Sequence, residues 1–142
     1  MSNKVVIYTD GGSRGNPGPS AIGVYFKDLN KRYSQHLGKA TNNEAEYKAI
    51  LFTLKKAKQL VGKKETKKAI IEIRSDSQLI VSQLNGKFKI KEEEFWPFFI
   101  EIWNLRQDFG EIVFKHISRE ENKVADSLVN EELDKKEISK LF

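Results

Sequence analysis

The stretch VVIYTDGG, residues 5–12, decides how the rest of the chain is interpreted. Its first five residues are β-branched or aromatic, which is typical of a buried central strand. Residues 11–20 contain four glycines and two prolines, so we expect a tightly turned loop there. Asp10 thus ends a strand beside a loop, a position where open α/β sheets bind ligands. The alternative is that Asp10 only starts a turn, as aspartate before glycine often does.

Outward from this strand, the hydrophobic periodicity predicts a mixed α/β fold. Further strands are expected over 21–27, 31–39, 69–74 and 111–117, and helices over 41–61, 76–84, 93–108 and from 122 to the end. A capping box at Thr41 and Glu44 opens the first helix, and Ser75 is the expected N-cap of the second. We expect a single α/β domain over 1–142, with a five-stranded mixed sheet, an antiparallel meander of its first three strands and helices on both faces.

The composition excludes several classes of site. The 142 residues include no cysteine, which excludes disulfides, thiol nucleophiles and thiolate metal sites. Because the only histidines are His36 and His116, we expect any metal to be a hard cation held by oxygen atoms. No run approaches the roughly 20 apolar residues of a membrane span, and no secretory signal is visible. We therefore expect a cytoplasmic monomer with neither a membrane nor an obligate protein partner.

Four acidic residues fall where solvation is not their obvious role. Asp10 and Asp76 each follow a predicted strand, so neighbouring strands would bring both carboxylates to one end of the sheet. Like charges placed together are unfavourable unless a cation joins them. Glu46 shares a helix face with apolar residues such as Ile50, so it needs a polar partner unless it reaches water from an edge. Asp126 interrupts the apolar stripe of the last helix, and it is either part of a site or the polar border of that stripe.

The motifs around these acids resemble those of type 1 ribonuclease H. They are YTDGGSRGNPGP at 8–19, TNNEAEY at 41–47, SDSQ at 75–78 and REENKVAD at 119–126. All four occur in the family's order, with family-like spacing and across nearly the whole chain. The resemblance implies the ribonuclease H-like fold. It also implies an endonuclease that cuts the RNA strand of RNA–DNA hybrids and leaves 3′-hydroxyl and 5′-phosphate ends.

The resemblance further implies the residues of the site. The metal ligands would be four carboxylates that hold two Mg²⁺ ions, with Mn²⁺ able to substitute: Asp10, Glu46, Asp76 and Asp126. The substrate contacts would lie beside the RNA strand or at a DNA phosphate: Gly11, Asn16, Thr41, Asn43 and Gln78. Asn16, Thr41 and Asn43 also have plain structural roles, in a turn or at the start of a helix.

An auxiliary residue near the reacting phosphate is implied as well, and two residues compete for it. Arg119 stands in the loop before the last helix and is always cationic, so it suits a phosphate. His116 shares a strand face with Ile112 and Phe114, so a half-buried structural histidine is the alternative there. We prefer Arg119 for the auxiliary role.

The basic residues are unevenly distributed along the chain. The net charge is +5, from 25 Lys and Arg and 20 Asp and Glu, yet residues 55–68 alone carry seven lysines and one glutamate, or +6. This segment is either a solvated helix face and loop or a patch that contacts a nucleic acid backbone. The long basic protrusion of some family members is replaced by the short link 85–92, so we expect weaker substrate affinity than in those members.

Other functions are compatible with the same motifs. A catalytically silent nucleic-acid-binding domain of this fold is one, although it would not need all four acids. An integrase-like enzyme is another, but that family places its glutamate last, whereas Glu46 comes second here. A reverse-transcriptase fragment is a third, although we expect a free-standing domain.

Overall fold

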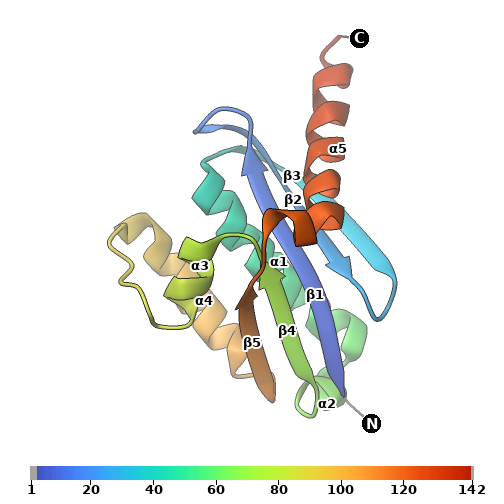
Figure 1. The fold of residues 1–142 in the computed structure, drawn as a ribbon, viewed down its shortest axis with the longest axis vertical. Coiled ribbons are helices and arrows are strands. Elements are labelled where there is room, and N and C mark those ends of the chain that lie inside the picture. Colours follow the sequence, from blue (N-terminus) through green and yellow to red (C-terminus); the bar gives the residue numbers. More distant parts are fainter. Residues whose placement is uncertain (1–2, 142) are drawn as a thin grey trace.

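The computed structural model describes residues 3–141, and a five-stranded sheet lies at its centre (Figure 1). The strands are β1 (Lys4–Ser13), β2 (Gly18–Phe26), β3 (Lys31–Ala40), β4 (Ile70–Ser75) and β5 (Glu111–His116). Their order across the sheet is β3-β2-β1-β4-β5, with antiparallel pairs among the first three and parallel pairs β1–β4 and β4–β5. The predicted mixed sheet and meander are confirmed.

Helices cover both faces of this sheet, as predicted. They are α1 (Asn42–Val61), α2 (Lys63–Thr66), α3 (Gln78–Leu84), α4 (Trp96–Arg106) and α5 (Lys123–Ser139), with 3₁₀ turns η1 (Glu93–Phe95) and η2 (Arg119–Asn122). A Cβ at Gly11 would meet α1 and one at Gly12 would meet α5, and successive strand residues point to opposite faces. Among the described residues, no helix combines the length and the apolar character that crossing a membrane requires.

The main core lies between the sheet and the helices α1, α3 and α4. Buried side chains of β1 and β4 such as Ile7 and Ile73 pack there with Ile50 of α1. Tyr47 is also fully buried, and its hydroxyl donates a hydrogen bond to the side-chain oxygen of Gln83. On the opposite face, α5 forms a smaller apolar cluster with β2 through Val129. The two layers of helices leave the end of the sheet near Asp10 between them.

The glycine-rich stretch is mostly strand, so the loop predicted over 11–20 is wrong. The antiparallel pairing of β1 with β2 continues through Gly11, Gly12 and Ser13, which leaves only residues 14–17 as the connection. The glycines serve close packing, because a Cβ at Gly11 would lie 2.3 Å from the carbonyl carbon of Ala45 in α1. Glycine usually indicates a turn, but here it lies within a strand because helices pack closely against both faces of that strand.

Several helix ends also differ from the predictions. Helix α3 begins at Gln78 because the hydroxyl of Ser77 accepts a hydrogen bond from the backbone N–H of Ile80, so the predicted cap at Ser75 is wrong. The short helix α2 was not predicted at all. Pro97 lies in the first turn of α4, as its missing N–H requires. The capping box of α1 at Thr41 is confirmed.

Candidate active site

Two strand ends bring the first pair of acids together. Strands β1 and β4 are parallel neighbours in which Thr9 pairs with Ser75, so Asp10 and Asp76 follow at the same end of the sheet. Helix α1 starts beside this end and adds Glu46 from its face toward the sheet. One oxygen of each of these three carboxylates lies within 4.8 Å of the other two. The predicted meeting of carboxylates is confirmed for these three residues.

The fourth acid, Asp126, reaches the site from the opposite face of the sheet. It lines a cleft of about 140 Å³ together with Asp10, Asp76 and Arg119, but it lies outside the cluster of three carboxylates. Helix α5 is held in place by Asn122, whose side-chain N–H donates a 2.8 Å hydrogen bond to the carbonyl of Thr9. Because Thr9 precedes Asp10, this contact joins the start of α5 to the strand that carries the site.

Glu46 is buried, and a backbone group orients its carboxylate. The N–H of Gly11 donates a hydrogen bond to the Oε1 atom of Glu46. Only a glycine at this position lets α1 approach the strand closely enough for that bond, since a Cβ would collide with Ala45. The expectation that Glu46 needs a polar partner is confirmed, whereas its alternative position at a solvated edge is wrong. The predicted contact of Gly11 with substrate stays a prediction.

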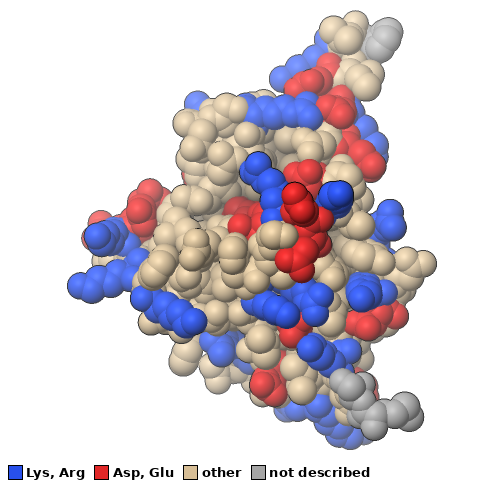
Figure 2. All heavy atoms as spheres, in the orientation of Figure 1, with Lys and Arg blue, Asp and Glu red and all other residues tan. Residues whose placement is uncertain are grey.

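Burial and the crowding of negative charge raise the pKa of two carboxyl groups in the site. Burial, followed by the charges of Asp76 and Asp126, raises the pKa of Asp10 to about 7. Burial, followed by the charges of Asp10 and Asp76, raises the pKa of Glu46 well above its ordinary value. Figure 2 shows acidic atoms gathered near the middle of one face, with basic side chains around them. Carboxylates packed in this way, without cysteine or histidine among them, are suited to a hard divalent cation.

Comparisons with known proteins agree with this arrangement. Residues 8–132 match the family model described as reverse transcriptase-like. The crystal structure of LC11-RNase H1, a protein isolated from compost and solved with an RNA/DNA hybrid, is 41% identical. The two align over 93% of this chain and 98% of that chain, with a TM-score of 0.87. The chain belongs to the type 1 ribonuclease H family.

Two further relatives differ in how much of their own length the chain covers. The ribonuclease H1 of the archaeon Halobacterium salinarum is 34% identical, with 93% of this chain and 98% of that chain covered and a TM-score of 0.83. A bifunctional protein of Mycobacterium tuberculosis is 36% identical over 136 residues, which are 92% of this chain but 36% of the relative. The chain thus spans about a third of that curated relative's length.

Of the five substrate contacts expected for a ribonuclease H, Gly11 lines the cleft, and two others have structural partners. The hydroxyl of Thr41 accepts a 3.2 Å hydrogen bond from the N–H of Glu44 as the N-cap of α1. The Oδ1 atom of Asn16 accepts a 2.9 Å hydrogen bond from the N–H of Asn42, which ties residues 14–17 to α1. Asn43 is half-buried in the first turn of α1, and Gln78 is exposed at the start of α3. Their contacts with substrate stay predictions.

The two candidates for the auxiliary role differ in position. Arg119 lies in η2 and lines the same cleft as Asp10, and it is exposed to solvent. His116 ends β5, where it pairs with Ser75, and it is exposed, so the alternative of a half-buried structural histidine is wrong. His116 does not belong to the lining of the cleft. The geometry therefore favours Arg119.

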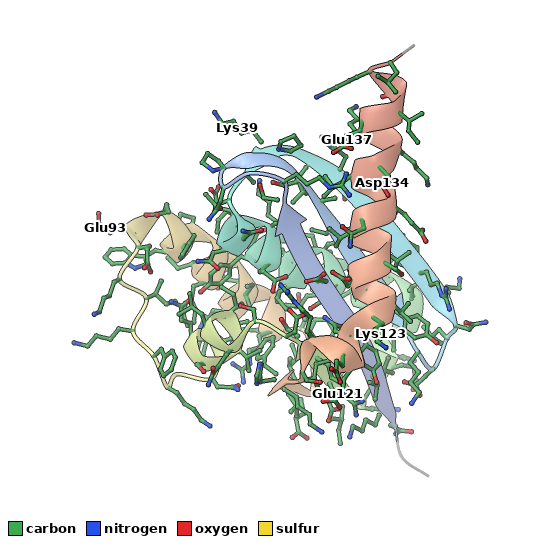
Figure 3. The ribbon with its side chains drawn as sticks, turned by 45° about the horizontal axis from the view of Figure 1, so that its top comes forward. Lys39, Glu93, Glu121, Lys123, Asp134 and Glu137 are labelled. Atoms are coloured by element: carbon green, nitrogen blue, oxygen red, sulfur yellow. The ribbon has the colours of Figure 1, made fainter. Side chains whose placement is uncertain are left out.

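Arg14 also lines the cleft, a role that the sequence does not indicate. Its guanidinium forms ion pairs of 2.7 Å with both Asp134 and Glu137 of α5, whose positions Figure 3 labels. The arginine thereby ties residues 14–17 to a helix that begins more than a hundred residues later. Its position in the glycine-rich motif was the only signal, and nothing local to it indicates a partner so far along the chain.

Proposed function

We propose that this chain is a metal-dependent endonuclease that hydrolyses the RNA strand of RNA–DNA hybrids. The observation that carries the proposal is the cluster of Asp10, Glu46 and Asp76, with oxygen atoms within 4.8 Å of one another and Asp126 on the same cleft. Family membership supports it, as does the hybrid bound in the structure of LC11-RNase H1. All four acids that the resemblance implies are present, which argues against a silent binding domain.

The donor set fits divalent cations. Asp10, Glu46, Asp76 and Asp126 would hold two Mg²⁺ ions, and Mn²⁺ would substitute because both metals prefer oxygen ligands. Divalent cations bound there would lower the pKa of a bound water, so that its hydroxide form could attack the scissile phosphodiester. They would also offset the charge on the leaving 3′-oxygen, which would give 3′-hydroxyl and 5′-phosphate ends. The raised pKa values of Asp10 and Glu46 support this fit, since a nearby cation favours their charged forms.

The remaining steps belong to the chain's own residues. The N–H of Gly11 orients the Glu46 carboxylate, which lies in the cluster with Asp10 and Asp76. The guanidinium of Arg119 lines the cleft, so it stabilises the charge that develops on the phosphate. RNA differs from DNA in its 2′-hydroxyl, which both donates and accepts hydrogen bonds. The side-chain amides of Asn16, Asn43 and Gln78 offer the same two capacities, and we assign the recognition of RNA to them.

Cleavage of three labelled nucleic acids tests the proposed function. An RNA–DNA hybrid, single-stranded RNA and duplex DNA are each incubated with and without Mg²⁺. We expect cleavage of the RNA in the hybrid alone, and only with metal. Asp10→Asn should abolish cleavage while binding to the hybrid survives. Asp28→Asn, the same chemical change at an exposed turn residue, should cleave at the wild-type rate.

Each other outcome contradicts part of the proposal. Cleavage without metal, or equal cleavage of all three substrates, would exclude the mechanism. Tight binding of the hybrid without cleavage in either Mg²⁺ or Mn²⁺ would instead identify a silent binding domain. Near wild-type activity of Asp10→Asn would exclude Asp10 as a metal ligand.

A further inference from the structure

The lysine-rich segment that the proposed function leaves unused forms a pocket at the far end of α1. We call it the lysine pocket; its volume is about 280 Å³, and its lining consists of Lys58, Lys63, Lys64, Thr66, Lys67 and Asp108. Four of the six lining residues are lysines and one is an acid. The segment is thus more than a solvated helix face, because the turn after α1 brings these lysines around one hollow.

The backbone that carries these lysines is fixed by buried contacts. Thr66 is 1% exposed, and its hydroxyl donates a 3.1 Å hydrogen bond to the carbonyl of Lys63. The carbonyl of Thr66 accepts a 2.9 Å hydrogen bond from the N–H of Gly110, which docks α2 on the turn before β5. A Cβ at Gly110 would lie 2.2 Å from the carbonyl oxygen of Lys67, so the two segments are in close contact. The arrangement of the lysines is therefore built into the fold.

The positive charge of the pocket is mostly uncompensated. Asp108 pairs with Lys58 at 2.8 Å, and its pKa is lowered first by that contact and then by the charges of Lys63 and Lys67. In the described part of the chain, Lys63, Lys64 and Lys67 have no ion-pair partner within 4.0 Å. Residues 55–68 carry a net charge of +6, whereas the whole chain carries +5. The rest of the chain therefore has a net charge of −1. A segment with this excess of positive charge favours long-range attraction of a polyanion.

The lysine pocket is separate from the carboxylate cluster. Glu46 and Gly62 are separated by 16 residues of α1, which at about 1.5 Å a residue places the pocket roughly 24 Å from the cluster along the helix axis. Figure 1 shows α2 at the end of the sheet near the N-terminus, opposite the end to which β1 points. A phosphate held by the carboxylates is therefore out of reach of these lysines.

We propose that the lysine pocket binds the phosphodiester backbone of a nucleic acid segment that lies outside the active site. Lysine is a compact point charge that suits phosphate oxygens, and it carries no sequence preference. The lining contains no apolar side chain that could insert into a lipid bilayer. It also lacks the aromatic anchors that dominate protein interfaces. The inference rests on the proposed function only because the substrate there is itself a nucleic acid.

Such a site would keep the enzyme on nucleic acid between encounters with its hybrid. Two sources offer the same backbone, namely a neighbouring duplex and a single-stranded tail of the substrate. Binding at the second site raises the local concentration of the substrate without touching the reacting phosphate. It therefore lowers KM on extended substrates and leaves kcat unchanged.

A charge-removal variant tests the site directly. Lys63→Gln, Lys64→Gln and Lys67→Gln are combined, and fluorescence anisotropy measures the affinity for duplex DNA of about 30 base pairs across a range of salt concentrations. We expect Kd to rise by about tenfold and the slope of log K against log salt to become shallower by about 2–3, the loss of three phosphate contacts. The control combines Lys31→Gln, Lys135→Gln and Lys140→Gln, which removes the same charge from scattered exposed positions. Its slope should stay close to the wild-type slope.

Cleavage assays then separate the two sources and keep the inference distinct from the proposed function. A short blunt hybrid should be cleaved by the pocket variant with wild-type kcat and KM. A raised KM on the same hybrid with a single-stranded DNA extension identifies the substrate's tail, and a loss confined to duplex DNA binding identifies a neighbouring duplex. If the pocket variant and the scattered control bind DNA alike and cleave the extended hybrid alike, the inference is overturned. Absence of cleavage in the wild-type protein would contradict the proposed function but not the DNA-binding result.

Discussion

In the metal-free protein, the ionised carboxylates of Asp10 and Glu46 destabilise the folded state. Both are buried at 8% exposure, and each faces the other and Asp76. Burial and like charge both raise the pKa of a carboxyl group, so each group destabilises the folded state when it is ionised at neutral pH. A structure with such a cost at the end of two strands is organised for a cation rather than for stability.

Asp10→Asn should therefore stabilise the metal-free protein. We expect the free energy of unfolding in chelator at pH 7.5 to rise by about 1–2 kcal/mol, because one charge leaves the cluster. Mg²⁺ should raise the melting temperature of the wild type but not that of the variant. Thermal unfolding with chelator and with Mg²⁺ measures both effects, and Glu94→Gln, which removes one carboxylate charge at an exposed position, should behave as the wild type. Equal stabilisation by Mg²⁺ in both proteins would show that Asp10 does not hold the ion.

Alanine variants of Arg119 and His116 should differ in kcat. Arg119→Ala removes a cation from the cleft, so we expect kcat on the hybrid to fall by about 10- to 100-fold. His116→Ala should keep kcat within about twofold, since the imidazole lies outside the cleft lining. Both side chains are exposed, and the melting temperatures should not change. A loss of turnover in the His116 variant alone would reverse the assignment.

Two helices reach the site because two glycines let them. Gly11 brings α1 and hence Glu46 to β1, and Gly23 brings α5 and hence Asp126 to β2. A Cβ at Gly23 would lie 2.3 Å from the carbonyl oxygen of Ala125, a backbone atom that cannot move without its helix. Register supports the same geometry, because Asp10 and Gly23 are directly paired. The helices thus carry the acidic residues, and the absence of a Cβ atom at Gly11 and Gly23 sets how closely the helices approach the sheet.

Gly23→Ala should disturb α5 as a unit. We expect the free energy of unfolding to fall by about 1–3 kcal/mol through overpacking, and activity to fall because Asp126 moves with the helix. Gly12→Ala is the matched control for stability, since its Cβ would meet only the Cγ1 atom of Val129 at 3.3 Å. Urea unfolding of both variants measures the difference. Similar stability of the two variants would mean that α5 shifts freely over the sheet.

At the scale of the whole molecule, an ion pair at a buried carboxylate links two neighbouring strands of the sheet. Glu72 of β4 is buried and contacts Lys4 of β1 at 2.9 Å and Arg74 at 2.6 Å. Burial alone would raise the pKa of Glu72, but the hydrogen bonds from Lys4 and Arg74 lower it further than burial raises it. Ionised Glu72 therefore favours the folded state.

The sign of that shift gives a pH dependence. A carboxyl whose pKa is lowered by folding adds stability above its unfolded pKa of 4.5 and loses it as the pH falls through the lower folded value. Glu72→Gln should reduce the free energy of unfolding by about 1 kcal/mol at pH 7, a difference that disappears in acid below the folded pKa. Glu101→Gln, which breaks the exposed pair with Lys55, should change it by less than about 0.5 kcal/mol. A Glu72→Gln deficit that persists unchanged in acid would contradict the ion-pair origin.

Local pattern was enough to predict most of the elements and part of the site. Alternation and helical periodicity depend on near neighbours along the chain, so the sheet and the capping box at Thr41 could be predicted, whereas the burial of Glu46 was one of two open alternatives. Parallel pairing of the strands then placed Asp10 and Asp76 at one end of the sheet. The absence of cysteine and the scarcity of histidine left carboxylates as the metal ligands.

Only the tertiary structure decided which distant groups meet. Arg14 pairs with α5 more than a hundred residues away, and Asn122 donates to Thr9 from the same distance, contacts that no local pattern encodes. The glycines at 11 and 12 were interpreted as a loop because their role, the close approach of α1 and α5, depends on helices elsewhere in the chain. Whether the lysines near Asp108 form a solvated surface or a binding patch could not be decided from the sequence, because the pocket also depends on distant segments. Periodicity reports the face on which a residue lies, and packing determines what that face meets.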